Sequence, residues 1–130
     1  MKIDHIAIWV HNLEAMKNFY VQYFGGNANS KYHNPNKNFN SYFIEFDTGC
    51  RLELMKRPDI LESNFATKNK EYIGLTHFAM SVGTREKVDR LTELLRSDNF
   101  VVIGEPRTTG DGYYESVILD PEDNRVEITD

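Results

Sequence analysis

Hydrophobic residues recur along the chain with two different spacings, which predict its strands and helices. Residues 3–10 (IDHIAIWV) combine β-forming residues on two distinct faces, a pattern typical of a strand. From Leu13 to Phe24 the apolar residues instead recur every three or four positions, which predicts a helix capped by Asn12 and ended by Gly25 and Gly26. The strands that follow are predicted over residues 27–33 (weakly), 41–46 and 51–55. The order is β-α-β-β-β.

The second half of the chain repeats this order. A strand over residues 76–82 (THFAMSV) is followed by a helix that Thr84 caps and that ends by residues 97–99. Three further strands are predicted over residues 100–106, 113–119 and 125–129. His77 follows His5 by 72 residues and Glu127 follows Glu53 by 74, so corresponding residues of the two halves are separated by nearly the same number of positions. We interpret this as an internal duplication.

The duplication predicts an α+β fold of two tandem β-α-β-β-β modules, whose curved mixed sheets surround a central site. The first module is expected over residues 1–56 and the second over residues 74–130, together forming one domain. Residues 57–73 form a polar stretch that is long for a loop inside a compact domain, and we predict that they link the modules.

Side chains alternate between the two faces of a strand, so the apolar face that a helix covers identifies the opposite one. In the first strand Ile6 and Ile8 define the covered face, and in THFAMSV the same argument applies to Phe78 and Met80. RLELM and RVEIT each alternate leucine, valine or isoleucine with a glutamate. The polar residues assigned in this way to the helix-free faces are His5, Glu53, His77 and Glu127.

These four residues are the candidate metal ligands. A single strand histidine is usually just hydrogen-bonded and a single glutamate usually solvated, but matched positions in a duplicated module favour a shared role. Ala7, Ala79 and Ser81 are small neighbours that leave room for an ion. Two imidazoles and two carboxylates suit one divalent ion, Zn²⁺, Ni²⁺, Co²⁺, Mn²⁺ or Fe²⁺, with positions left for water or substrate.

Charge and composition narrow the classes of partner. The formal net charge is −5, and no cluster of Lys and Arg is longer than a pair. The sequence therefore predicts no basic surface that would bind nucleic acid or an anionic membrane. No apolar run approaches the roughly 18 residues of a membrane span. A small-molecule substrate is therefore expected. The one cysteine, Cys50, cannot form an intrachain disulfide, and this favours a reducing, cytoplasmic location.

Four segments resemble the vicinal oxygen chelate superfamily, which includes glyoxalase I, methylmalonyl-CoA epimerase, extradiol dioxygenases and bleomycin-resistance proteins. They are DHIAIWVHNLEAMKNFYVQYFG, RLELM, GLTHFAMSV and DPEDNRVEI, and the resemblance covers essentially the whole chain. The set His5, Glu53, His77 and Glu127 is similar to the ligand sets of glyoxalase I and the epimerase. Extradiol dioxygenases and fosfomycin-modifying transferases typically use only the two histidines and the last glutamate.

The resemblance implies a metal-dependent lyase or isomerase of the glyoxalase type, with Glu53 and Glu127 as catalytic residues that carry a proton next to a carbonyl. Glutathione is not implied, because the first strand has Trp9 and no arginine where small bacterial glyoxalases often bind the glutathione carboxylate. The alternatives are an extradiol-type dioxygenase, a small-molecule thiol transferase and a metal-free ligand-binding protein. Exposed sheet edges and the length of the linker predict a homodimer.

Overall fold

A computed structural model describes residues 1–61 and 73–130 of the chain. These residues divide into two compact units, one before and one after the segment 62–72, and each unit is described by itself. Most of the predicted linker, residues 57–73, lies outside the described residues.

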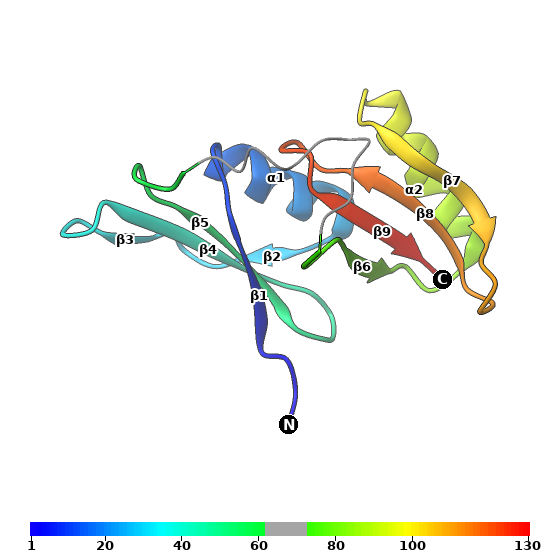
Figure 1. Ribbon diagram of the computed structural model, residues 1–130, viewed down its shortest axis with the longest axis horizontal. Helices are drawn as coiled ribbons and strands as arrows, with labels where there is room; N and C mark the ends of the chain where they lie inside the picture. The colour runs from blue at the N-terminus through cyan, green and yellow to red at the C-terminus, as the bar shows by residue number, and fades with distance from the viewer. Residues whose placement is uncertain (62–72) are drawn as a thin grey trace. The chain divides into compact units, whose positions relative to one another are not determined.

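The first unit is a five-stranded mixed sheet with one helix (Figure 1). Its elements are β1 (His5–Trp9), α1 (Leu13–Phe24), β2 (Asn27–Ala28), β3 (Tyr32–Asn34), β4 (Phe39–Glu45) and β5 (Arg51–Lys56). The strand order is β1-β5-β4-β2, and β3 also pairs with β4. β1 runs parallel to β5, whereas the other pairings are antiparallel.

The second unit has the same plan with four strands (Figure 1). Its elements are β6 (Phe78–Ser81), α2 (Arg85–Ser97), β7 (Val102–Thr108), β8 (Tyr114–Leu119) and β9 (Arg125–Thr129). The order is β6-β9-β8-β7, with β6 parallel to β9 and the other pairs antiparallel. β6 and β9 thus correspond to β1 and β5, which confirms the predicted α+β fold of two repeated modules.

Most observed strands begin or end within two residues of the predicted positions, and the differences at residues 27–33 and 76–82 are the most informative. The weak strand predicted over residues 27–33 is divided into β2 and β3, because Asn29 leaves the regular ladder. Its side-chain oxygen accepts from the Phe43 N–H at 2.9 Å, and its own N–H donates to the Phe43 carbonyl at 3.0 Å. β6 begins at Phe78, so His77 lies just before the strand and not inside it. The caps at Asn12 and Thr84 and the left-handed Gly25 are confirmed.

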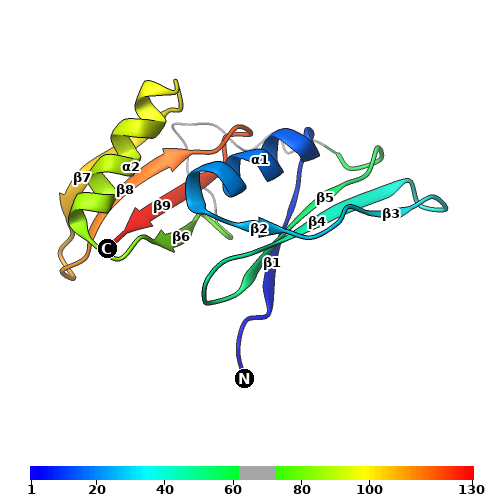
Figure 2. The same ribbon diagram turned by 180° about the vertical axis from the view of Figure 1, so that it is seen from behind.

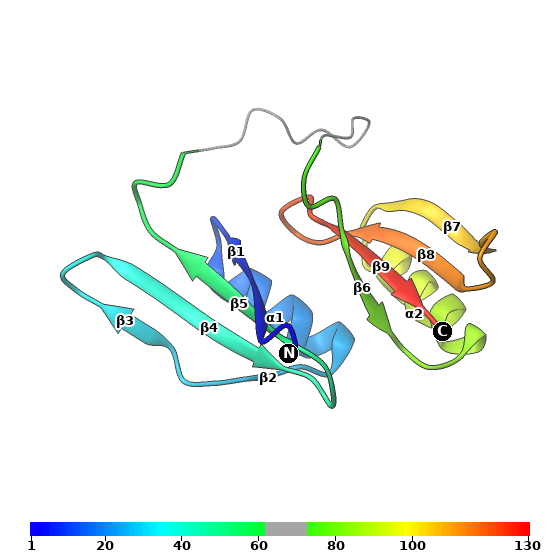
Figure 3. The ribbon, with the colours of Figure 1, turned by 60° about the horizontal axis from the view of Figure 1, so that its bottom comes forward.

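Each helix covers one face of its own sheet, as Figures 2 and 3 show for α1 and α2. The side chains buried in these two cores are Met16, Tyr20, Ile44, Leu52 and Leu54 in the first unit, and Val88, Leu95, Ile118, Val126 and Ile128 in the second. Because residues alternate along β5 and β9, the burial of Leu54 and Ile128 turns Glu53 and Glu127 to the opposite, helix-free faces. Neither α1 nor α2, nor any other helix in the described part of the chain, is long and apolar enough to span a membrane.

Gly26→Ala is expected to destabilise the first unit by about 1–3 kcal/mol through overpacking. A Cβ at this position would lie 2.4 Å from Cγ2 of Ile44, which is fully buried. Gly25→Asn is the matched control, because Gly25 has φ +66° with nothing within 4 Å, and asparagine tolerates this conformation. The urea midpoint followed by circular dichroism should fall clearly more for Gly26→Ala than for Gly25→Asn. Equal midpoints would contradict the packing argument.

Candidate metal centre

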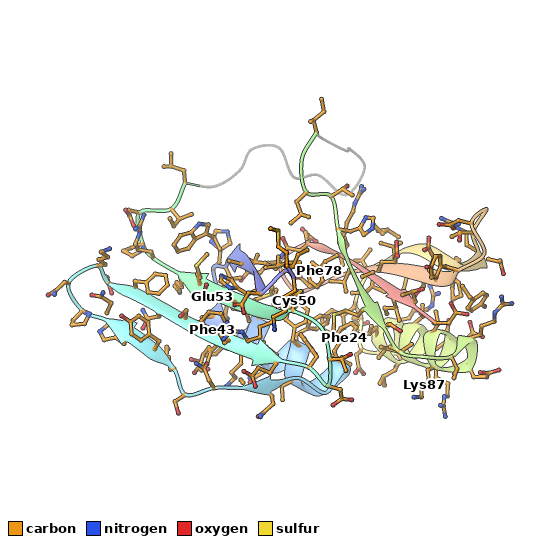
Figure 4. All side chains as sticks on the ribbon, turned by 90° about the horizontal axis from the view of Figure 1, so that it is seen from below. Phe24, Phe43, Cys50, Glu53, Phe78 and Lys87 are labelled. Carbon is orange, nitrogen blue, oxygen red and sulfur yellow. The ribbon has the colours of Figure 1, made fainter. Side chains whose placement is uncertain are left out.

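The parallel pair of β1 and β5 brings His5 and Glu53 together on the helix-free face of the first sheet. Ala7 is the Cα partner of Glu53 and His5 that of Arg51, so His5 lies two residue pairs along the strands from Glu53, on the same face. His5 Nε2 is 3.8 Å from Glu53 Oε2. The Glu53 side chain is only 14% exposed, and Figure 4 marks it beside Phe43, its Cα partner on β4.

The second unit repeats this pairing with His77 and Glu127. His77 immediately precedes β6, and Glu127 on β9 is the Cα partner of Ala79. His77 Nε2 lies 3.4 Å from Glu127 Oε2, and the glutamate side chain is 18% exposed. Each unit therefore presents one histidine nitrogen and one largely covered carboxylate at equivalent places in the fold.

The two separations can be compared with those of donors that share an ion. Two donors about 2.1 Å from one ion are about 3.0 Å apart at a right angle and about 3.4 Å apart at a tetrahedral angle. The second pair lies in this range, and the first exceeds it by a few tenths of an ångström. Within residues 1–61 and 73–130, no three His, Cys, Asp or Glu side chains are grouped so that they could hold an ion. Each unit thus offers one pair of donors, at a fitting separation in the second unit and slightly too far apart in the first, and a set of four donors needs both units.

Glu115 is an acidic residue beside Glu127 that is not among the site residues predicted from the sequence. It lies on β8, whose Val117 is the Cα partner of Glu127, and alternation puts Glu115 on the same face. Burial, followed by the charge of Glu127, raises the pKa of Glu115, and a hydrogen bond between the two carboxyl groups adds to this; Arg107, 3.3 Å away, opposes it. YYESVIL has one polar residue on each face, Ser116 and Glu115, so its alternation alone does not identify the face of Glu115.

His5 has charged and aromatic neighbours in the first unit. Its Nδ1 lies 3.0 Å from Asp4 Oδ2, and its ring meets Phe43 edge-to-face with centroids 5.4 Å apart. Arg51 donates to the same Asp4 oxygen and stacks 4.4 Å above the Phe43 ring. The hydrogen bond to His5 and the contact with Arg51 hold the pKa of the Asp4 carboxyl below its usual value.

Three further polar residues of the two sheets have partners within their own unit. Arg51 and Arg107 pair with Asp4 and Glu115, respectively. The Tyr114 hydroxyl donates to Asp89 of α2 at 2.8 Å, so this side chain lies on the helix side of the sheet and does not line the ligand face. His33 is exposed, and its Nδ1 lies 2.9 Å from Asn40 Oδ1, so we interpret it as a surface residue.

The family of this chain follows from a match over nearly the whole sequence. Residues 2–128 match the sequence profile of the Glyoxalase/Bleomycin resistance protein/Dioxygenase superfamily. The chain belongs to this superfamily. No curated protein is significantly similar to it in sequence.

Solved structures from the glyoxalase family share the fold over nearly the whole chain. A glyoxalase family protein from Enterococcus faecalis is 25% identical, with a TM-score of 0.76, over 99% of this chain and 97% of that one. The trypanothione-dependent glyoxalase I of Leishmania major is 19% identical (TM-score 0.76, 98% and 85% covered). A lactoylglutathione lyase from Agrobacterium tumefaciens is 21% identical (TM-score 0.67, 98% and 91% covered). The last two proteins are less than 25% identical to this chain, so their similarity shows a shared fold and no more.

Proposed function

We propose that the protein is a metal-dependent lyase or isomerase of the glyoxalase type, which moves a proton next to a carbonyl group of a small molecule. One divalent ion, Zn²⁺, Ni²⁺, Co²⁺, Mn²⁺ or Fe²⁺, would be held by His5, Glu53, His77 and Glu127. The observation that carries the proposal is the repeated histidine–glutamate pair, 3.8 Å apart in one unit and 3.4 Å in the other. Membership of the superfamily and glyoxalase I structures of the same fold support it.

The two glutamates supply the proton chemistry in this proposal. When bound, a divalent ion acts as a Lewis acid that stabilises negative charge on substrate oxygens. One glutamate takes the proton from the carbon next to the carbonyl; the electron pair of that C–H bond forms a C=C bond, and the π pair of the C=O bond moves to the oxygen. A glutamate then returns the proton, to the neighbouring carbon in a glyoxalase-like reaction or to the opposite face of the same carbon in an epimerase-like one. Low exposure keeps both carboxylates largely away from bulk water.

A homodimer is proposed together with this activity. Within the described residues, β1 and β6 are the terminal strands of their sheets, so each has one row of backbone N–H and C=O groups that its own sheet does not pair. Pairing between copies of the chain would cover such edges. The cytoplasmic location stays a prediction from the single cysteine.

The proposed reaction is tested by the exchange of substrate protons with deuterated water. Metal-loaded protein should incorporate deuterium next to the carbonyl of at least one member of a panel of α-hydroxycarbonyl hemithioacetals and 2-substituted acyl thioesters, as read by NMR. This assay detects proton removal without knowledge of the final product. No exchange in any of them, together with consumption of O2 in the presence of a catechol and Fe²⁺, would replace the proposal by an extradiol dioxygenase. No turnover together with tight binding of a ligand by metal-free protein would favour a binding protein.

A further inference from the structure

The contact between Asp4 and His5 determines which nitrogen of the imidazole carries the proton. An ionised carboxylate can only accept hydrogen bonds, so the 3.0 Å contact from His5 Nδ1 to Asp4 Oδ2 requires a proton on Nδ1. The neutral ring then has its lone pair on Nε2. This is the nitrogen that faces Glu53, with 3.8 Å between Nε2 and Oε2.

Four contacts hold Asp4 and the His5 ring in place. Arg51 donates through Nη2 to Asp4 Oδ2, and its backbone N–H donates to the Asp4 carbonyl at 3.0 Å. The Arg51 guanidinium in turn stacks on Phe43, whose ring meets the His5 imidazole edge-to-face at an interplanar angle of 87°. His5 is therefore restrained by an anion on one side and an aromatic ring on another.

The second unit lacks this arrangement around its own histidine. Thr76, a neutral residue, takes the place of Asp4 in front of His77, and Val117 takes the place of Phe43 opposite the glutamate. In the part of the chain that the structure describes, no side chain hydrogen-bonds to Nδ1 of His77. Both halves of the candidate site thus contain a histidine and a glutamate. Among the described residues, the histidine of the first half has a carboxylate beside its Nδ1, and that of the second half does not.

We propose that Asp4 is a positioning residue that holds His5 in the Nδ1-protonated tautomer, and that it makes the first unit the preorganised half of the metal site. A carboxylate or carbonyl behind a ligating histidine fixes its tautomer and orientation, and loss of such a partner typically lowers metal affinity by roughly 10- to 100-fold. The effect on affinity depends on the metal site proposed above, whereas the tautomer does not.

Metal-free, ¹⁵N-labelled protein tests the tautomer directly. Long-range ¹H–¹⁵N spectra at a pH of about 8, above the ordinary histidine pKa of about 6.5, distinguish protonated from unprotonated ring nitrogens. His5, assigned from the signals that His5→Ala removes, should have its proton on Nδ1. Asp4→Ala should shift His5 toward the Nε2-protonated form and weaken Zn²⁺ binding by roughly 10- to 100-fold, measured by competition with a chelating dye. Thr76→Ala is the matched control and should change neither His5 nor the affinity.

Three results would overturn the inference. They are a wild-type His5 protonated on Nε2, an Asp4→Ala variant that keeps the Nδ1 proton, and an altered tautomer with unchanged Zn²⁺ affinity. If wild-type protein binds no divalent ion at all, the proposed function fails, and the wild-type and Asp4→Ala spectra alone then decide whether Asp4 sets the His5 tautomer.

Discussion

Glu127→Gln is expected to lower turnover by roughly 10²- to 10⁴-fold with little loss of bound metal, the usual consequence of removing a general base. Glutamine keeps the size of the side chain and an oxygen donor beside His77, but it cannot take up the substrate proton. The measurement is the rate of deuterium incorporation by metal-loaded protein, with metal content determined on the same sample. Glu53→Gln should behave similarly if the two glutamates share the proton transfer.

A glutamate on the protein surface provides the control for Glu127→Gln. Glu93 lies on α2, its side chain is 66% exposed, and among the described residues its ion pair is with Arg96 of the same helix, at 3.3 Å. Glu93→Gln should leave both the exchange rate and the metal content unchanged. Wild-type exchange rates in both Glu127→Gln and Glu53→Gln would show that neither carboxylate carries the proton.

His5→Ala and His77→Ala are each expected to reduce the affinity for Zn²⁺ by more than the roughly 10- to 100-fold typical of losing an outer-shell partner. Each variant removes one of the two nitrogen donors, and the carboxylate 3.8 or 3.4 Å away would be left to bind without it. Affinity would be measured by dye competition on chelator-treated protein. The unfolding midpoint of each variant should stay close to the wild-type value, because both histidine side chains are about 40% exposed.

His33→Ala serves as the control for these two variants. His33 is also a strand residue, on β3, but its Nδ1 lies beside Asn40, and in the described part of the chain no ion pair joins it to a glutamate. Its replacement should leave Zn²⁺ affinity unchanged. An equal loss of affinity in all three variants would indicate nonspecific binding to exposed imidazoles, and no loss in any of them would remove His5 and His77 from the proposed site.

The fold could be predicted from the sequence because its elements are strongly patterned. The stripe from Leu13 to Phe24 and the caps at Asn12 and Thr84 define both helices, and the structure agrees with them. The alternation in RLELM and RVEIT was enough to assign Glu53 and Glu127 to the helix-free faces. Two leucines flank Glu53, and a valine and an isoleucine flank Glu127. The repeat then grouped these glutamates with His5 and His77 as candidate ligands.

What could not be predicted depends on contacts between residues far apart in the chain. Arg51 reaches Asp4 across the β1–β5 pair, so the support behind His5 exists only once that register is formed. The division of the strand over residues 27–33 follows from the hydrogen bonds between Asn29 and Phe43. Glu115 pairs with Arg107 through the β7–β8 register, which contains bulges that local pattern does not indicate.

The most direct test of the metal site is the position of a bound ion in a crystal. Protein freed of metal with a chelator, reloaded with Ni²⁺ and crystallised would be measured at the nickel absorption edge. The account predicts one anomalous peak per pair of modules, about 2.0–2.2 Å from Nε2 of His5 and His77 and from a carboxylate oxygen of Glu53 and Glu127. The same map would show whether the two pairs come from one chain or from two copies. A peak bound by other residues, or no peak at these four side chains in fully loaded protein, would contradict it.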